Sequence, residues 1–468
     1  MPQPLESAEI PRRPWPILLA AAVLALALVN ADCVLSQRYL AQDGSYFFLI
    51  ILRGHGYAMW DRARDYANWL TQLPAVTLIH DFGCRDVKLI GLAFGAALFF
   101  LPLAGVPLAW WAARRAPRHF LLYPLLSYAI LFLDSGYFII SEAHIAAALF
   151  WPMLYLLLFS ERLTVLRSGL LIAMAAAAVR SYETYLFLSW PLLFCAWRRG
   201  RASWAERRYG QWLTCSVASL LYLLAVAVAL KATIIPRHAG RRADFAVSLI
   251  AHFFYPAVVF SLAALALVFL MLFRPEWSRA ERRVKLAICA GGIVVPLLPV
   301  LGFVVPGLQV LSRVQALYVP LLLGLLAIAL SSGFDVLSER ARRLEWELLM
   351  VTALVCAVAA VFQWGTTLQW NRFRCDLLAE LRPPRGVVAH EEIAQRRGKM
   401  AWFVDAQFEQ SMGCFLPTLS VTLSALNLGH VATIIDAPRD TSWKPIDPRN
   451  AEEYVNVGDY VPVRVLPK

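Results

Sequence analysis

The feature that most constrains this chain is a succession of long apolar runs separated by short charged segments. The chain has 468 residues, of which 59% are hydrophobic and 16% are charged, and a water-soluble domain is not expected to be so apolar. About eleven runs are long enough to cross the roughly 30 Å hydrocarbon core of a bilayer. They lie at 15–33, 88–112, 119–134, 143–159, 168–180, 183–197, 211–230, 246–273, 286–305, 315–330 and 347–363. We therefore predict a mainly α-helical, polytopic membrane protein with about eleven transmembrane helices.

The segments between the runs alternate in charge, and this alternation predicts their sidedness. Arginine is dense in 113–119, 197–210, 274–285 and 338–345, whereas 134–144 contains no lysine or arginine. Cytoplasmic loops of membrane proteins carry the excess of these residues, so we place the arginine-dense segments and the N-terminus in the cytoplasm. An odd number of spans then puts the C-terminus outside. The predicted location is a bacterial-type cytoplasmic (inner) membrane.

The net charge of +12 does not by itself indicate a nucleic-acid partner. The basic residues are scattered among short loops instead of being gathered on one soluble face. Two arginines precede the first apolar run, and no small-residue cleavage site follows it. We expect this run to remain as a membrane anchor, and we expect membrane lipids, but no nucleic acid, among the partners.

The composition changes near residue 364, which predicts two domains. Residues 1–363 hold the apolar runs, whereas 364–468 combine short apolar stretches with proline-rich loops. Within this tail, "GVVAHEEI" and "HVATIIDAP" predict short strands, and "LLAELRPPRG" predicts a helix that is ended by proline. We predict a small extracytoplasmic α/β domain over 364–468, after a transmembrane domain over 1–363.

The first outer loop, 34–87, is longer than the other predicted loops between spans. It contains "SYFFLIIL" and "RARDYANWLTQLPAVTLIH", in which apolar and aromatic residues alternate with charged ones. Such segments are typical of amphipathic helices that lie along the membrane interface. A loop of this length predicts a site at the lipid boundary. A simple plug over the helix bundle is the alternative.

Two predicted outer loops carry carboxylates at similar depth. Asp43 stands in the first loop, while Asp134 and Glu142 flank the second and are followed by His144. Carboxylates at the ends of spans are costly unless they reach water, a cation or a ligand. These acids are candidate catalytic residues. The alternative is that they cap helix ends, and for Asp43 that it forms an Asp-Gly turn or a helix cap.

Several arginines fall on the predicted outer side, against the charge rule. Arg237 and Arg241 lie in 231–245, and Arg180 and Arg313 stand at outer ends of spans. Arginine suits bidentate phosphate binding, so these four residues and His144 are candidate phosphate ligands. Snorkelling toward outer-leaflet head groups is the alternative. For Arg180, a local ion pair with Glu183 is a second alternative.

Sequence motifs exclude several other kinds of site. The chain has no nucleotide-binding loop, no dinucleotide fingerprint, no HExxH motif and no CxxC pair. Four cysteines fall on the predicted outer side, which leaves disulfides between Cys33 and Cys84 or between Cys375 and Cys414 as possible pairings in an oxidising compartment. A metal site is not specified by any motif.

The arrangement resembles that of the GT-C superfamily of membrane glycosyltransferases, whose members use polyprenyl-phosphate-linked sugars. The resemblance rests on "AQDGSYFF" in a long first outer loop, on the acidic second loop "DSGYFIISEAH", and on the terminal outer domain. It implies a lipid-linked sugar donor and a glycan, lipid or protein acceptor. It also implies that Asp43 is a catalytic base or lies beside a divalent metal such as Mg²⁺ or Mn²⁺. A single early acid replaces the commoner acidic doublet, which leaves metal dependence open.

The mechanism implied by this resemblance is an inverting displacement. A carboxylate, Asp43 assisted by Glu142 or Asp134, takes the proton of the attacking hydroxyl, and arginines stabilise the leaving phosphate. Alternatives are an O-antigen ligase or polymerase, a transporter or flippase for a lipid-linked glycan, and a scaffold without chemistry. The ligase typically uses a large late outer loop, and transporters often carry charges at the bilayer midplane on repeated halves. Neither pattern is evident here.

Overall fold

The computed structural model describes residues 14–41, 43–59, 64–134, 142–234, 263, 266–268, 313–331, 335–397, 415–437 and 456–465. These residues are mainly helical. The first half contains α1 (Pro14–Leu35), the short 3-10 helix η1 (Arg38–Leu40), α2 (Asp43–Gly54), α3 (Asp65–His80), α4 (Val87–Ala112), η2 (Arg118–Leu121), α5 (Leu122–Asp134), α6 (Glu142–Phe159), α7 (Val165–Ala178), α8 (Tyr185–Ala205) and α9 (Tyr209–Ile234). The second half contains α13 (Arg313–Ser331), α14 (Asp335–Arg343), α15 (Glu345–Leu381), β1 (Gly386–Val388), α16 (His390–Arg397), α18 (Leu416–Asn427) and β2 (Thr433–Ile435).

Five helices in the described part of the chain are long and apolar enough to cross a membrane. They are Trp15–Leu35, Val87–Ala112, Glu142–Phe159, Tyr209–Ala232 and Glu345–Leu381. Helices α5, α7, α8 and α13 coincide with four more of the predicted runs but are shorter or carry more charge. The run 286–305 and almost all of 246–273 lie outside the described residues. Eleven spans therefore stay a prediction, while a membrane protein built of several apolar helices is supported.

Local sequence explains where several helices begin and end. The Asp86 side chain accepts hydrogen bonds from the backbone N–H groups of Lys88 (2.8 Å) and Leu89 (3.3 Å) and so caps α4. Helix α15 stops at Leu381, just before the two prolines at 383 and 384, because proline cannot continue a helix. Prolines inside α4 and α6 are tolerated, as is common in membrane helices.

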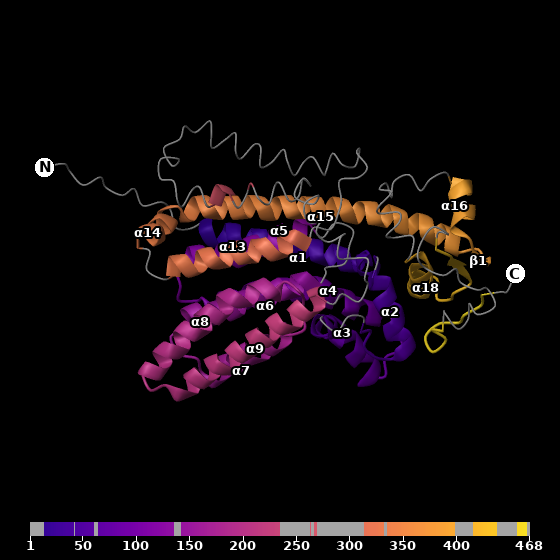
Figure 1. Ribbon diagram of the computed structural model, residues 1–468. Helices are drawn as coiled ribbons and strands as arrows, with labels where there is room; N and C mark the ends of the chain where they lie inside the picture. The colour runs from indigo at the N-terminus through magenta and orange to yellow at the C-terminus, as the bar shows by residue number, and fades with distance from the viewer. Residues whose placement is uncertain are drawn as a thin grey trace.

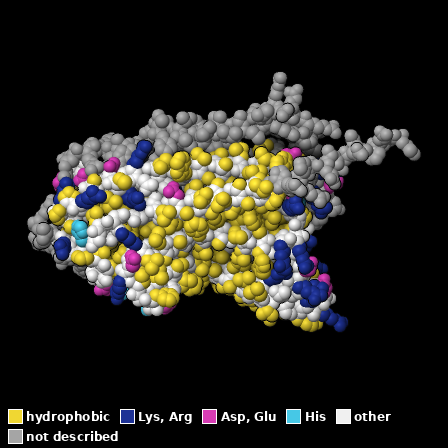
Figure 2. All heavy atoms as spheres, turned by 180° about the vertical axis from the view of Figure 1, so that it is seen from behind, with side chains coloured by type: hydrophobic (Ala, Val, Ile, Leu, Met, Phe, Trp, Pro, Cys, Tyr) yellow, Lys and Arg dark blue, Asp and Glu magenta, His cyan; other side chains and the backbone are white. Residues whose placement is uncertain are grey.

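The helices form an elongated bundle with two chemically different ends (Figure 1). At one end, Arg115 pairs with Glu161 across two loops, and Arg199 donates to the Leu157 carbonyl at 3.0 Å. We call this the arginine-rich end. Helices α2, α3 and α18 lie at the other end, with β1 and α16. Between the ends, Figure 2 shows a broad hydrophobic band on one face, with charged side chains gathered beyond it on both sides. This distribution is the one expected of a protein that crosses a bilayer.

A fully buried arginine joins three elements of the bundle. Arg38 has no exposed surface. Its Nη2 donates to the Gln363 side-chain oxygen at 2.6 Å, and its Nη1 donates to the Gln363 carbonyl at 3.2 Å and to Thr367 Oγ1 at 3.3 Å. The Gln363 amide in turn donates to the carbonyls of Phe132 and Leu133 on α5. The guanidinium thus fastens the end of α1 to α15 and, through Gln363, to α5.

The residue after Arg38 fixes the same turn against α4. Tyr39 is almost completely buried, and its ring packs edge-on against Phe48 and Phe94. The ring lies across Gly91 and Gly95 of α4, where a Cβ atom at either position would collide with it. Glycine is therefore required at Gly95 for close approach of a side chain and not for backbone conformation.

One of the two cysteine pairings that the sequence left open, Cys33 with Cys84, is not formed. Cys33 lies inside α1, is buried, and contacts Thr367 Oγ1 at 3.5 Å and Arg38 Nη1 at 3.3 Å. Cys33 and Cys84 are both free thiols, and so is the exposed Cys375. Cys414 lies outside the described residues. The burial of Cys33 in a helix packed on α15 is the physical reason that it does not reach Cys84.

The tail packs against the first loop, and no linker separates it at residue 364. Helix α15 runs through this predicted boundary without a break. Each of the two segments predicted as strands contains a short one, and these form the parallel pair β1 and β2. The second half of "GVVAHEEI" is instead helical, because α16 begins at His390. Helix α18 packs on α2, where Ser45 and Thr418 share a 2.8 Å hydrogen bond, and the Asn427 amide donates to Gln37 at 2.8 Å. A separate α/β domain is not established. The two segments that the sequence assigned to amphipathic helices are helical, as α2 and α3.

We predict that Arg38→Ala strongly destabilises the protein, because the acceptors on Gln363, Thr367 and Cys33 lose a donor in a fully buried site. Each buried polar group left unpaired costs about 1–3 kcal/mol. Arg53→Ala, at an exposed position on α2, is the matched control and is expected to change the free energy of unfolding by less than about 0.5 kcal/mol. Thermal unfolding in detergent measures both. Equal stability of the two variants contradicts the role given to Arg38.

We also predict opposite effects of two Gly→Ala substitutions within helices. Gly95→Ala forces the Tyr39 ring to move and lowers the melting temperature. Gly169→Ala, at a position on α7 with no atom near the added methyl group, is neutral or slightly stabilising, because alanine favours a helix by about 1 kcal/mol over glycine. A Gly95→Ala protein that melts at or above the wild-type temperature shows that Tyr39 is not held by this contact.

Candidate active site

Charged residues from three separate loops meet beside α3, α6 and α8. Arg64 and Asp65 stand at the start of α3, Glu142 is the first residue of α6, and Arg180 and Glu183 lie in the turn between α7 and α8. We call these five residues the charged cluster. All three loops are predicted from the sequence to be extracytoplasmic. The structure therefore brings together loops that the charge pattern had placed on one side.

Two ion pairs hold the charged cluster together. Arg64 binds Glu183 through two nitrogens, with Nη2 to Oε1 at 2.8 Å and Nε to the two carboxylate oxygens at 3.1 and 3.2 Å. Arg180 pairs with Asp65. The local pair between Arg180 and Glu183 that the sequence allowed is not the arrangement described: both residues reach across to the first loop. Such bidentate contacts fix orientation as well as charge.

Aromatic side chains surround the two guanidinium groups. Arg64 lies over the Tyr182 ring, 4.8 Å from its centre, and Arg180 lies over the Tyr66 ring at 5.3 Å. The Tyr66 backbone N–H donates to the Arg180 carbonyl at 3.0 Å. Cation–π contacts and the backbone bond therefore join the start of α3 to the α7–α8 turn.

Glu142 is held near Arg64 but more loosely than Glu183 is. The Glu142 Oε2 atom lies 3.9 Å from Arg64 Nη1, beyond hydrogen-bond distance, and its side chain is 17% exposed. Burial alone would lower the pKa of Arg64, but Tyr182, Glu183 and Glu142 together raise it well above its ordinary value, so the guanidinium stays charged. Three carboxylates against two guanidinium groups leave the charged cluster with one net negative charge.

The remaining predicted acids lie elsewhere or are described only by their backbone. Asp43 is the first residue of α2 and is exposed; its helix packs mainly on η1 and α18. Asp134 ends α5, directly after Leu133, whose carbonyl accepts from Gln363. The structure joins Glu142 and Arg180 in one cluster and places Asp43 on a different helix of the same end.

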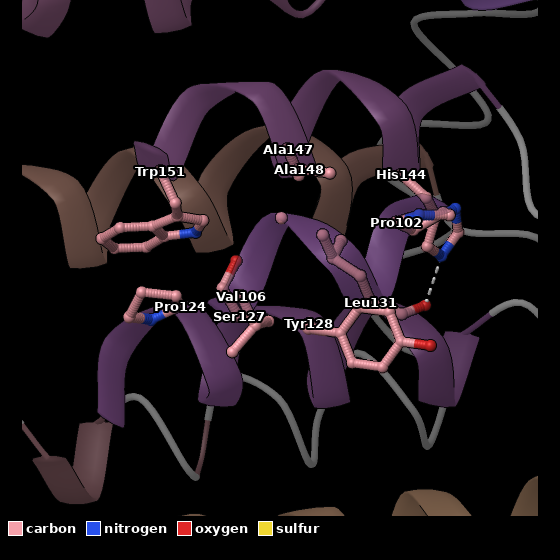
Figure 3. A pocket seen from close by; sticks show the side chains of 11 residues that line it. Pro102, Val106, Pro124, Ser127, Tyr128, Leu131, His144, Ala147, Ala148 and Trp151 are labelled. Atoms are coloured by element: carbon pink, nitrogen blue, oxygen red, sulfur yellow. Dashed lines mark hydrogen bonds between the residues drawn. The ribbon is translucent and has the colours of Figure 1, made fainter. Parts of the chain in front are cut away.

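His144 points into the bundle, where its Nε2 lies 2.9 Å from the Leu131 carbonyl (Figure 3). It lines a pocket between α4, α5 and α6 that also includes Ser127, Tyr128 and Trp151. The pocket volume open to water is about 10 Å³, which is room for about one water molecule. A sugar or phosphate does not fit there. The assignment of His144 to a phosphate stays a prediction.

The side chains of the other predicted phosphate ligands lie outside the described part of the structure. Arg313 is the first residue of α13, and only its backbone is described. Arg237 and Arg241 lie outside the described residues. Their roles stay predictions.

The charged cluster does not suit a metal ion. Across the described ranges, no group of three or more histidine, cysteine, aspartate or glutamate residues is arranged to hold one. Arg64 lies 2.8 Å from Glu183 and 3.9 Å from Glu142, so a positive charge already stands beside both carboxylates. We therefore assign no step of the chemistry to a metal.

Comparison with known proteins does not identify a family. No family model, no curated protein and no solved structure matches this chain. The functional argument consequently rests on the sequence and on the geometry of the site.

Arg64 and Asp65 are site residues that the sequence did not single out. Both stand in "RARDYANWL", which the sequence marked only as an amphipathic segment. Charged residues in an interfacial helix are normally exposed to water. For this reason the sequence did not mark Arg64 and Asp65 as site residues. The usable signal was the pair of opposite charges at the helix start, facing the isolated Arg180 and Glu183.

We predict a measurable coupling between Arg64 and Glu183 in a double-mutant cycle. Arg64→Gln, Glu183→Gln and the double variant are expected to give a coupling free energy of about 1–2 kcal/mol in unfolding measurements. The exposed pair Arg85 and Asp459, 3.8 Å apart, is the control cycle and is expected to give less than about 0.5 kcal/mol. Equal coupling free energies in the two cycles show that the partly buried Arg64–Glu183 pair contributes no more to stability than an exposed ion pair does.

Proposed function

We propose that this protein is a membrane glycosyltransferase that moves a sugar from a polyprenyl-phosphate donor to a glycan, lipid or protein acceptor. In this proposal the chain has eleven spans, its N-terminus is cytoplasmic, and the reaction takes place on the outer face of a bacterial inner membrane. The observation that carries it is the convergence of carboxylates and arginines from three predicted outer loops in the charged cluster. The GT-C-like arrangement of these loops supports the same reading.

The reaction requires a base, a group that stabilises the leaving phosphate, and access from the lipid. The acceptor oxygen forms a bond to the anomeric carbon, the bond from that carbon to the phosphate oxygen breaks, and a carboxylate takes the hydroxyl proton. One base without a nucleophilic partner inverts the anomeric configuration, by analogy with inverting glycosidases. The leaving polyprenyl phosphate carries the developing negative charge, which guanidinium groups stabilise.

The described residues support two candidates for the base. Asp43 is exposed at the N-terminus of α2, where helix amides stabilise the ionised carboxylate. Glu142 faces Arg64 without a hydrogen bond at 3.9 Å, so it can accept a proton without breaking the Arg64–Glu183 pair. We assign the base to Asp43, with Glu142 assisting. Arg180 supplies positive charge to the donor phosphate, with Arg313, Arg237 and Arg241 as further proposed ligands.

The decisive experiment incubates the purified full chain with polyprenyl-phosphate-linked sugars and acceptor-containing membranes, and measures release of polyprenyl phosphate. Asp43→Asn and Glu142→Gln are expected to lower turnover, Asp43→Asn by about 10²-fold or more, because a positioned general base contributes that much. Asp81→Asn, an exposed carboxylate in the same loop, is the matched control and should keep full activity.

Two results contradict the proposal. Full turnover by Asp43→Asn in well-folded protein removes Asp43 as the base. Movement of intact lipid-linked sugar across proteoliposomes, without cleavage of the sugar–phosphate bond, makes the protein a flippase. In that case the charged cluster recognises the substrate and takes no part in a reaction.

A further inference from the structure

A basic cavity lies at the arginine-rich end, away from the charged cluster. It has a volume of about 170 Å³ and lies between the loop after α4 and the loop that joins α6 to α7. Its lining residues are Ala112, Arg114, Arg115, Phe159, Glu161, Arg162, Thr164 and Arg167. We call this space the basic cavity. Its size suits one phosphate group together with a few waters.

The charges around the basic cavity are strongly unbalanced. Four arginines face one carboxylate, Glu161, which is already paired with Arg115. The hydrogen bond and the charge of Arg115 lower the pKa of Glu161, and Arg167 and Arg162 contribute in the same direction. The cavity therefore keeps about three unneutralised positive charges at neutral pH. Arginine is the side chain best suited to phosphate oxygens.

One of the four arginines, Arg167, is held in place by an aromatic ring and a backbone carbonyl. Arg167 stacks over Trp111, 5.4 Å from the ring centre, and its Nη1 donates to the Arg162 carbonyl at 3.1 Å. Helix α7 begins at the rim, where the Thr164 side chain caps it. The N-terminus of this 14-residue helix adds positive potential to the four arginines.

Apolar surface adjoins the basic cavity. Val165 and Leu166, in the first turn of α7, are 91% and 65% exposed. A freely diffusing phosphate makes no use of such a surface, whereas a phospholipid places its acyl chains there while its head group enters the cavity. Basic pockets between membrane helices on the cytoplasmic side are known to bind anionic lipid head groups.

We propose that the basic cavity is a binding site for the phosphate of an anionic phospholipid from the leaflet at the arginine-rich end. This site is separate from the proposed glycosyl transfer and does not depend on it. Arg114 and Arg162 provide charge, Arg167 orients the head group, and Val165 and Leu166 contact the chains. The lipid stabilises the junction of α4, α6 and α7.

The test compares two double variants that each remove two positive charges from the same end. Arg114→Gln with Arg162→Gln removes two of the four positive charges of the basic cavity without removing any side-chain hydrogen bond or ion pair described for these two residues. Arg201→Gln with Arg207→Gln is the control: Arg201 is exposed near the end of α8, and Arg207 is exposed just after it. The full-length protein is titrated with phosphatidylglycerol or phosphatidylcholine in detergent micelles at fixed ionic strength. Thermal unfolding and native mass spectrometry report binding.

We expect phosphatidylglycerol, but not phosphatidylcholine, to raise the melting temperature of the wild type and of the control variant. The cavity variant should need roughly 25-fold more phosphatidylglycerol for the same shift, since each of the two arginines contributes about fivefold. Equal responses of the two variants overturn the proposal, because the effect is then general to the charged end. Equal protection by inorganic pyrophosphate without lipid also overturns it and assigns the cavity to a free anion.

Discussion

The burial of the Arg38 guanidinium group determines how α1, α15 and α5 join. A charged group that is withdrawn from water is tolerated only when its hydrogen bonds are made within the protein. The two terminal nitrogens of Arg38 meet most of this demand with neutral acceptors from α15, whereas its Nε has no hydrogen-bond partner among the described residues. Gln363 extends the connection to α5. Neighbouring contacts reinforce it, because the Ser36 carbonyl accepts from Trp370 at 2.9 Å and from Arg374 at 2.6 Å. The long loop after α1 begins from this junction, so α2, α3 and their charged residues have a fixed starting point.

From that starting point, ion pairs across loops complete the candidate site. Arg64 lies near two carboxylates, Glu183 and Glu142, and Arg180 pairs with Asp65, the third carboxylate of the charged cluster. Each ion pair of the cluster therefore joins residues that are far apart in the sequence. A site assembled in this way depends on the relative placement of α3, α6 and α8, and small displacements of these helices alter its electrostatics. The other end of the bundle shows the opposite balance, with an excess of arginine around the basic cavity.

Sequence reasoning predicted the positions of the helices and strands well, but it predicted poorly which of them contact one another. Apolar runs and proline positions predicted helices such as α4 and α6, the end of α15, and both short strands, because these depend on local chemistry. The partners of Arg64 could not be read from the sequence, since Glu183 lies 119 residues away and periodicity does not show which loops touch. Arg38 was concealed for the same reason: in "SQRYL" it reads as a solvated loop residue, and only Gln363, 325 residues later, reveals its burial. The continuation of α15 past residue 364 was missed because a change in composition was taken for a domain boundary.

Helix α15 has a mechanical consequence. At 37 residues and 1.5 Å per residue, it is a rod about 55 Å long, nearly twice the hydrocarbon thickness of a bilayer. One end begins among the arginines near η2, and the other leads directly into the strand that pairs with β2. A helix of this length holds the two-stranded sheet at a fixed distance from the arginine-rich end. A tilt of α15 at the arginine-rich end therefore moves α18, and with it α2, the helix that carries Asp43.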